Sequence, residues 1–141
     1  MTPVEALQAT LAAEHAAVNV YGVLGGRVSV AEDPEAAVLL RAGYDSHRER
    51  RDLLRGRLAE QGETPVGAAP AYDVPARSRD ARRLLEVAAT TEERCAEVYA
   101  QQVASTSGEE RRWAVEALRD AAVRLLALGG GPSAWPGLRE L

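Results

Sequence analysis

The chain has 141 residues, of which 17 are Lys or Arg and 21 are Asp or Glu, so its net charge is −4 at pH 7. This acidic balance argues against a protein that holds nucleic acid on a basic face. Charged residues interrupt every apolar stretch before it reaches the length of a membrane span, which argues against membrane insertion. The single cysteine cannot form an internal disulfide, and the first ten residues lack the pattern of a signal peptide, so we expect a cytoplasmic protein. The length fits one domain over residues 1–141.

The first predicted helix covers about residues 3–30. Thr2, Pro3 and Glu5 supply a capping hydroxyl, a proline at the first helical position and an acid three residues after the cap. Apolar residues then recur at intervals of three and four, as in a helix that packs one face into a core.

The second predicted helix covers about residues 34–61. It begins at Asp33-Pro34, again with a capping residue followed by a proline at the first helical position. The connection that follows, residues 62–78, contains three prolines and two glycines and therefore cannot be helical for long.

Two further helices are predicted, over about residues 79–106 and 108–128. Ser78 or Asp80 is expected to cap the first of them. The letters SGEE, which begin at Ser107, predict a second capping box at the start of the other.

The lengths of the connections predict how the helices are joined. Helices of about 28 residues are about 42 Å long, and short connections make the first two and the last two helices antiparallel neighbours. The middle connection of 17 residues reaches roughly 55 Å when extended, enough to run the length of the bundle. We therefore expect an all-α, ferritin-like four-helix bundle, with two antiparallel pairs joined by a long crossover; an up-down bundle with a slack loop is the alternative. In the tail, residues 129–141, Trp135 and Leu138 are expected to dock on the bundle.

Polar residues interrupt the apolar faces at one level of this bundle. At 100° per residue, Glu14, His47 and Glu92 fall on the inward faces of three helices, each near the middle of its helix. Carboxylates at the solvated edge of an apolar stripe are the alternative interpretation of each acid taken singly. The predicted buried polar cluster also includes neighbouring arginines and tyrosines on these faces: Arg50, Arg51, Tyr21, Tyr44 and Tyr99.

The stretches EHAAVNVYGVLG, YDSHRERRDLLRGRL, AAPAYDVP and TTEERCAEVYA resemble the ferritin-like superfamily, in particular its small bacterial ferritin-like domains of unknown function. Di-iron members of that superfamily place Glu on two helices and Glu-x-x-His on the other two. By this resemblance Glu14 and Glu92 match the single acids, and His47 matches a histidine. Tyr44 stands where the acid of that motif is expected, and the fourth helix has no histidine, so three of the six ligands are present.

Inward carboxylates need a cation, which leaves two hypotheses. In the first, Arg50, or else Arg51, binds both acids, no cofactor is needed, and the protein is a non-catalytic structural or interaction protein with a degraded di-metal site. In the second, Glu14, His47 and Glu92 hold a single iron or manganese ion in an oxidoreductase or storage protein. Enzymatic activity therefore stays open at this point. We expect a homodimer and leave any small-molecule ligand undefined.

Overall fold

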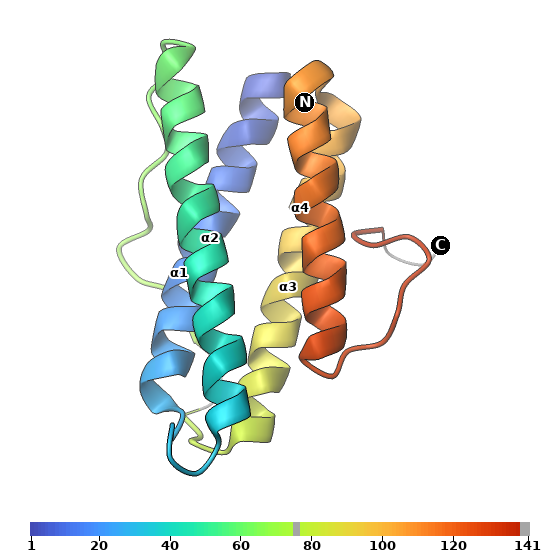
Figure 1. Cartoon of the computed structure of the whole chain (residues 1–141). Helices are drawn as coiled ribbons and strands as arrows, with labels where there is room; N and C mark the ends of the chain where they lie inside the picture. The colour runs from blue at the N-terminus through green and yellow to red at the C-terminus, as the bar shows by residue number, and fades with distance from the viewer. Residues whose placement is uncertain (75–76, 139–141) are drawn as a thin grey trace.

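The computed structural model describes residues 1–74 and 77–138, and within them the chain is all α-helical, without a strand. The helices are α1 (Pro3–Arg27), α2 (Pro34–Glu60), α3 (Ala81–Ser105) and α4 (Gly108–Ala127). They pack as a four-helix bundle in which α1 lies against α2 and α3, and α3 lies against α4 (Figure 1). In this part of the chain, no helix is both long and apolar enough to cross a membrane. Residues 75–76 of the predicted connection and 139–141 of the predicted tail lie outside the described residues.

The segment between α2 and α3 runs along the outside of the bundle, from the end of α2 to the opposite end of the molecule, where α3 begins (Figure 1). Gln8 on α1 holds this segment through two hydrogen bonds. Its Nε2 donates to the carbonyl oxygen of Thr64 (2.8 Å), and its Oε1 accepts from the backbone N–H of Val66 (2.8 Å). His15 lies beside the same stretch, with Nε2 3.0 Å from the carbonyl oxygen of Val66. Side chains of α1 therefore fix the start of the crossing segment.

The helices begin close to the residues predicted from the sequence, but the predicted cap residue does not always make a side-chain hydrogen bond. At α1, the hydroxyl of Thr2 accepts from Glu5 N–H (3.2 Å) and Glu5 accepts from Thr2 N–H (2.7 Å), which completes the predicted capping box. At α4 the predicted capping box is wrong, because the side chain of Ser107 makes no cap hydrogen bond. Gly108 follows it with a left-handed φ of +56°, which turns the backbone away from capping-box geometry.

The tail docks through its backbone and not through its large side chains. Trp135 and Leu138 are 73% and 62% exposed, so the expectation that they dock on the bundle is wrong. Gly137 makes the close approach instead: a Cβ added there would lie 2.2 Å from the carbonyl oxygen of Ala96 on α3. Gly137 also has a left-handed φ of +77°, so a glycine is needed at this position for two reasons.

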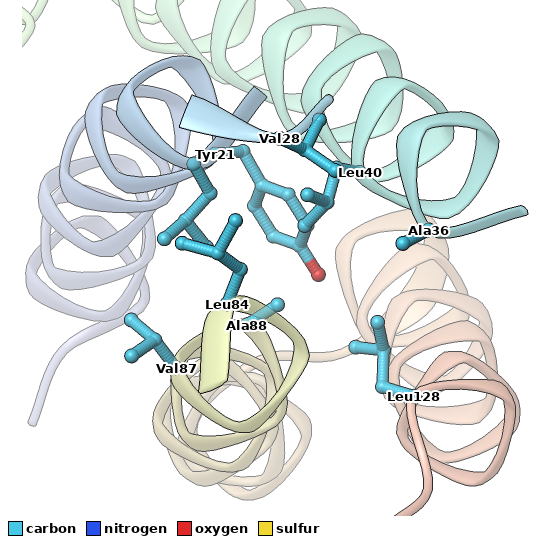
Figure 2. Close-up of a cluster of buried hydrophobic side chains, with 9 residues drawn as sticks. Tyr21, Val28, Ala36, Leu40, Leu84, Val87, Ala88 and Leu128 are labelled. Atoms are coloured by element: carbon cyan, nitrogen blue, oxygen red, sulfur yellow. The ribbon is translucent and has the colours of Figure 1, made fainter. Parts of the chain in front are cut away.

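Apolar side chains fill both ends of the bundle, and in its middle a third cluster of mostly small side chains lies beside the polar groups. Figure 2 shows the cluster at the end where α1 turns into α2, which includes Val28, Leu40, Leu84, Ala88 and Leu128. The cluster at the opposite end contains Leu7, Leu11, Leu54 and Leu58. Between these two clusters, the helices deliver charged and hydroxyl-bearing side chains to one level.

Candidate functional site

Three buried polar side chains from three helices meet in the middle of the bundle. Glu14 on α1, His47 on α2 and Glu92 on α3 have no exposed surface. His47 lies between the two acids, with Nδ1 2.7 Å from Glu14 Oε2 and Nε2 3.0 Å from Glu92 Oε1. Because both ring nitrogens face carboxylate oxygens, both donate hydrogen bonds, and the imidazole is a cation in this arrangement.

Two tyrosine hydroxyls bind the same carboxylates from opposite sides. The hydroxyl of Tyr21 donates to Glu92 Oε1 (2.5 Å), and the hydroxyl of Tyr99 donates to Glu14 Oε1. In Figure 2 the ring of Tyr21 points from α1 into the space between the helices. We call the five residues the central polar cluster: Glu14, Tyr21, His47, Glu92 and Tyr99.

A glycine on α2 makes room for one of these tyrosines. The ring of Tyr21 lies against Gly43, where an added Cβ would be 2.2 Å from Tyr21 Cε1. The ring also lies beside the His47 imidazole, with centroids 5.2 Å apart. Gly43 therefore allows the α1 tyrosine to pass close to the α2 backbone and reach Glu92 on α3.

Arg50 supports the cluster from outside. Its Nη1 donates to the hydroxyl oxygen of Tyr99 (3.2 Å), and its Nη2 donates to Asp120 Oδ2 on α4 (2.9 Å). The prediction that Arg50 itself binds both carboxylates is wrong, because His47 takes the place between them. The shorter imidazole ends at the centre of the bundle, whereas the longer Arg50 side chain extends past Tyr99 toward α4.

Two residues of the predicted cluster lie apart from it. Arg51 pairs with Asp52 (2.9 Å), and its side chain is 24% exposed. Tyr44 lies at the junction of α1 and α2, where its ring would be 3.6 Å from a Cβ added at Gly22. Both predictions are corrected for one reason: an inward helical face is narrow, and Tyr44 and Arg51 lie beside the buried positions of α2 and not among them.

A second arginine, which was not predicted from the sequence, completes the charge balance. Arg124 on α4 places Nε 3.5 Å from Glu92 Oε1 and donates from Nη2 to Ser46 Oγ (2.7 Å). Protonated His47 with its two acids leaves one negative charge, which the Arg124 guanidinium offsets. The only sequence signal was the position of Arg124 one turn after Asp120, on the same side of the last helix.

The surroundings of His47 shift several pKa values. Burial works to lower the pKa of His47, but hydrogen bonds and charge from Glu14 and Glu92 outweigh it, so the net shift is upward. Burial works to raise the pKa of Glu92, but His47, Tyr21 and Arg124 together lower it. Burial and the neighbouring acids raise the pKa of both Tyr21 and Tyr99. These pKa shifts favour a protonated His47, an ionised Glu92 and neutral hydroxyls on Tyr21 and Tyr99.

The donor set does not fit the di-metal centre that the family resemblance implies. A metal ligand needs an imidazole nitrogen with a free lone pair, but both nitrogens of His47 donate to carboxylates. The position of the missing acid is occupied by Tyr44, outside the cluster. Although Glu14, His47 and Glu92 meet, neither they nor any other three His, Cys, Asp or Glu side chains among the described residues are placed to hold one metal ion. The Arg124 guanidinium beside Glu92 would also repel a cation.

Cys95 lies near the cluster without joining it. It is buried, and burial together with the charges of Glu14 and Glu92 raises the pKa of its thiol well above the usual value. A thiol of this kind stays protonated and packs as a small apolar side chain.

The comparisons with known proteins agree with this fold and leave the chemistry open. The chain belongs to a family described as a domain of unknown function (DUF4439), whose model matches residues 6–140. The chain is similar to a conserved hypothetical protein, rv2844, from Mycobacterium tuberculosis, whose crystal structure superimposes with a TM-score of 0.80. The sequences are 26% identical, and the similarity covers 90% of this chain and 94% of that one. Among curated proteins, no match to this chain was found.

Proposed function

We propose that this protein is a non-catalytic ferritin-like bundle, with a structural or interaction role, in which an internal ion pair takes the place of a metal centre. The observation that carries this proposal is the position of His47 between Glu14 and Glu92, with both ring nitrogens hydrogen-bonded. In di-metal bundles, acids from facing helices converge on cations. In this chain the cation between the acids belongs to a side chain, so the acids are neutralised without a ligand.

The path of the chain supports the ferritin-like part of the proposal. The segment between α2 and α3 crosses from one end of the bundle to the other (Figure 1), so that α2 and α3 run in the same direction. Two helix hairpins joined in this way form the topology of ferritin-like folds. A cytoplasmic location is part of the proposal, and the reduced, buried Cys95 is compatible with it.

The metal content of the protein tests the proposal. Protein purified without chelator should contain far less than one equivalent of iron, manganese or zinc per chain, and chelator should leave its unfolding midpoint unchanged. Stoichiometric metal that is lost in Glu14→Ala would contradict the proposal. Glu93→Ala is the matched control, because Glu93 lies on the exposed side of α3 next to the buried Glu92.

We also propose that the interaction role includes self-association through the outer face of α1 and α2. A hollow of about 880 Å³ opens there, lined by residues that include Gly22 and Gly25. Val30 and Val38 line the same hollow, and they are 69% and 68% exposed. Apolar surface around a hollow marks an interaction site on a small protein.

Charge on this face favours a second copy as the partner. Arg41 and Asp45 line the hollow and pair with each other across one turn of α2 (3.2 Å), while their side chains stay 74% and 49% exposed. A two-fold axis places the same patch opposite itself, so that Arg41 of one copy meets Asp45 of the other. We infer a homodimer with this face at its centre.

Light scattering on the purified chain tests the dimer. Val38→Glu should halve the measured mass, because it buries an unpaired charge in the proposed interface. Val123→Glu, at a valine of α4 with the same exposure (67%), should leave the mass unchanged. A monomeric wild-type protein, or equal effects of the two variants, would contradict the proposed interface.

A further inference from the structure

A hollow of about 120 Å³ lies between α1, α3 and the crossing segment that joins α2 to α3. Val20 on α1 and Val87 on α3 give it an apolar part. Asp73 lines it from the crossing segment, and the neighbouring Val74 packs against the apolar cluster that contains Val87. Because Val74 is anchored in this cluster, the backbone holds Asp73 beside α3. The crossing segment therefore forms one wall of the hollow at a fixed position.

The charged side chains that line this hollow include both signs. Arg83, Glu86 and Arg94 line it from α3, opposite Asp73. Glu86 pairs with Arg82 (3.5 Å) and with Arg83 (3.1 Å), so the charges of Arg83 and Glu86 are already matched. The side chains of Asp73 and Arg94 belong to exposed residues, and neither has a hydrogen-bond or ion-pair partner within residues 1–74 and 77–138. A carboxylate and a guanidinium are thus accessible here, and they do not pair with each other.

Two threonine hydroxyls add hydrogen-bond acceptors to the hollow. Thr90 donates its hydroxyl hydrogen to the carbonyl oxygen of Glu86 (3.2 Å), and Thr91 donates to that of Val87 (3.0 Å). Because each hydroxyl hydrogen is used within the helix, only the oxygen lone pairs remain for a ligand. Such an oxygen accepts from an ammonium group but cannot donate to a carboxylate. The threonines therefore favour a ligand that carries N–H donors.

We propose that this hollow binds a free α-amino acid with a short side chain. The carboxylate of the amino acid accepts from the Arg94 guanidinium, and its ammonium group donates to Asp73 and to the threonine hydroxyls. Its side chain lies against Val20 and Val87. A volume of about 120 Å³ is well below that of a site for a drug-sized molecule, which limits the side chain to a few atoms. A molecule with only one charge would leave either Asp73 or Arg94 without a partner.

NMR titration of the isotope-labelled full chain with L-alanine tests the proposal. We expect saturable shifts of the amide signals of Val87, Thr90 and Thr91, which line the hollow. Propionate lacks the ammonium group of alanine, and ethylamine lacks its carboxylate, so each should bind about tenfold more weakly or worse. Absence of saturable shifts, or equal affinity for the three compounds, would overturn the proposal.

Two substitutions at exposed positions remove the charges one at a time. Asp73→Asn should lower the affinity for L-alanine about tenfold without lowering that for propionate, which has no ammonium group. Arg94→Gln should lower the affinity for L-alanine by a similar factor without lowering that for ethylamine. Arg55→Gln, at an exposed arginine of α2 outside the hollow, should bind L-alanine as the wild type does. An unchanged affinity for L-alanine in Asp73→Asn or Arg94→Gln would overturn the proposal.

This inference is independent of the proposed function. The hollow shares no lining residue with the central polar cluster or with the hollow on the face of α1 and α2. A chain that does not bind L-alanine would overturn this inference and leave the tests of metal content and of dimerisation unaffected.

Discussion

His47 is the residue on which the centre of the molecule depends. Its imidazole lies within hydrogen-bond distance of both Glu14 and Glu92, and each contact is a charge-assisted hydrogen bond with no exposed surface. Burying three charged groups offers little net stability, because the cost of desolvation offsets the attraction between them. Removing the cation alone is costly, since two buried carboxylates then lose the positive charge that lies between them.

We predict that His47→Gln lowers the free energy of unfolding by about 3–5 kcal/mol. His15→Gln changes the other histidine of the chain, which lies at the surface beside Val66, and should lower it by less than about 0.5 kcal/mol. Urea unfolding followed by circular dichroism measures both values. Equal effects of the two substitutions would show that His47 does not neutralise the acids.

The same network predicts how stability depends on pH. The pKa of His47 is raised above its ordinary value of 6.5, so its contribution is complete below pH 6.5 and is lost as pH rises through the folded-state pKa. The pKa of Glu92 is lowered from 4.5, so its contribution is complete above pH 4.5 and is lost as pH falls through the folded-state pKa. We therefore expect the network to stabilise the fold most between pH 4.5 and 6.5.

The difference in unfolding free energy between wild type and His47→Gln isolates this effect from the other titrating groups. It should narrow as pH rises above the folded-state pKa of His47. A difference that stays constant from about pH 6 to about pH 10 would mean that His47 is neutral in the native state.

At the scale of elements, α2 contacts its neighbours in two different ways. Against α1 it packs closely, because Gly43 brings its backbone against the ring of Tyr21. Toward α4 it reaches with long arginine side chains: Arg50 binds Asp120 (2.9 Å) and Arg57 binds Glu110 (2.8 Å). These contacts between α2 and α4 are therefore ion pairs, whereas the close packing of α2 against α1 depends on the small size of Gly43.

We predict that Gly43→Ala destabilises the protein, although alanine is the better helix former. The added methyl group would overlap the Tyr21 ring, and displacing that ring breaks its hydrogen bond to Glu92, at a cost of about 1–3 kcal/mol. Gly56→Ala is the matched control on the same helix, because nothing lies within 4 Å of its Cβ. It should be neutral or stabilise by up to about 1 kcal/mol.

Thermal unfolding measures both effects. Gly43→Ala should lower the unfolding midpoint temperature, whereas Gly56→Ala should leave it unchanged or raise it. A stabilising Gly43→Ala would indicate that the Tyr21 ring can move without loss, so that the close α1–α2 approach is not needed for the cluster.

At the scale of the whole molecule, the described part of the crossing segment contacts the bundle near its start, through Gln8 and His15, and later at Val74, which packs against an apolar cluster of the core. Gln8 makes two hydrogen bonds to it, at Thr64 and Val66, near its start. Most of the later described residues, 67–74 and 77–80, are exposed. Local opening of this segment does not require the helices to separate.

We predict that Gln8→Ala speeds tryptic cleavage at the exposed Arg77 while changing the global unfolding free energy by less than about 1 kcal/mol. The loss of two hydrogen bonds frees the segment, but the buried faces of the helices stay intact. Gln101→Ala, at an exposed glutamine of α3, is the control and should be cleaved at the wild-type rate. Identical cleavage rates in the two variants would show that Gln8 does not hold the segment.

Much of the molecule follows from local signals in the sequence. Prolines at the starts of α1 and α2 and glycines just beyond α2 and α4 mark the helix ends, although among the four N-cap residues only Thr2 makes a side-chain cap hydrogen bond. The end of α1 differs most from the prediction, at Arg27 and not near residue 30, because Val28 turns out of the helix and packs into the core. The helical period also placed Glu14, His47 and Glu92 on inward faces, where the structure buries all three. These properties depend on neighbours within one turn, so one helix at a time suffices to predict them.

The pairing of charges depended on tertiary structure alone. One of the two hypotheses from the sequence takes an arginine as the cation because its charge is permanent, whereas the bundle places the imidazole of His47 between the acids and Arg50 behind Tyr99. The approach of Arg124 to Glu92 from another helix was not predicted. Helical period gives the direction of a side chain but not its reach or the distance to the facing helix. Those two lengths decide which donor meets which carboxylate, and they exist only once the four helices have packed.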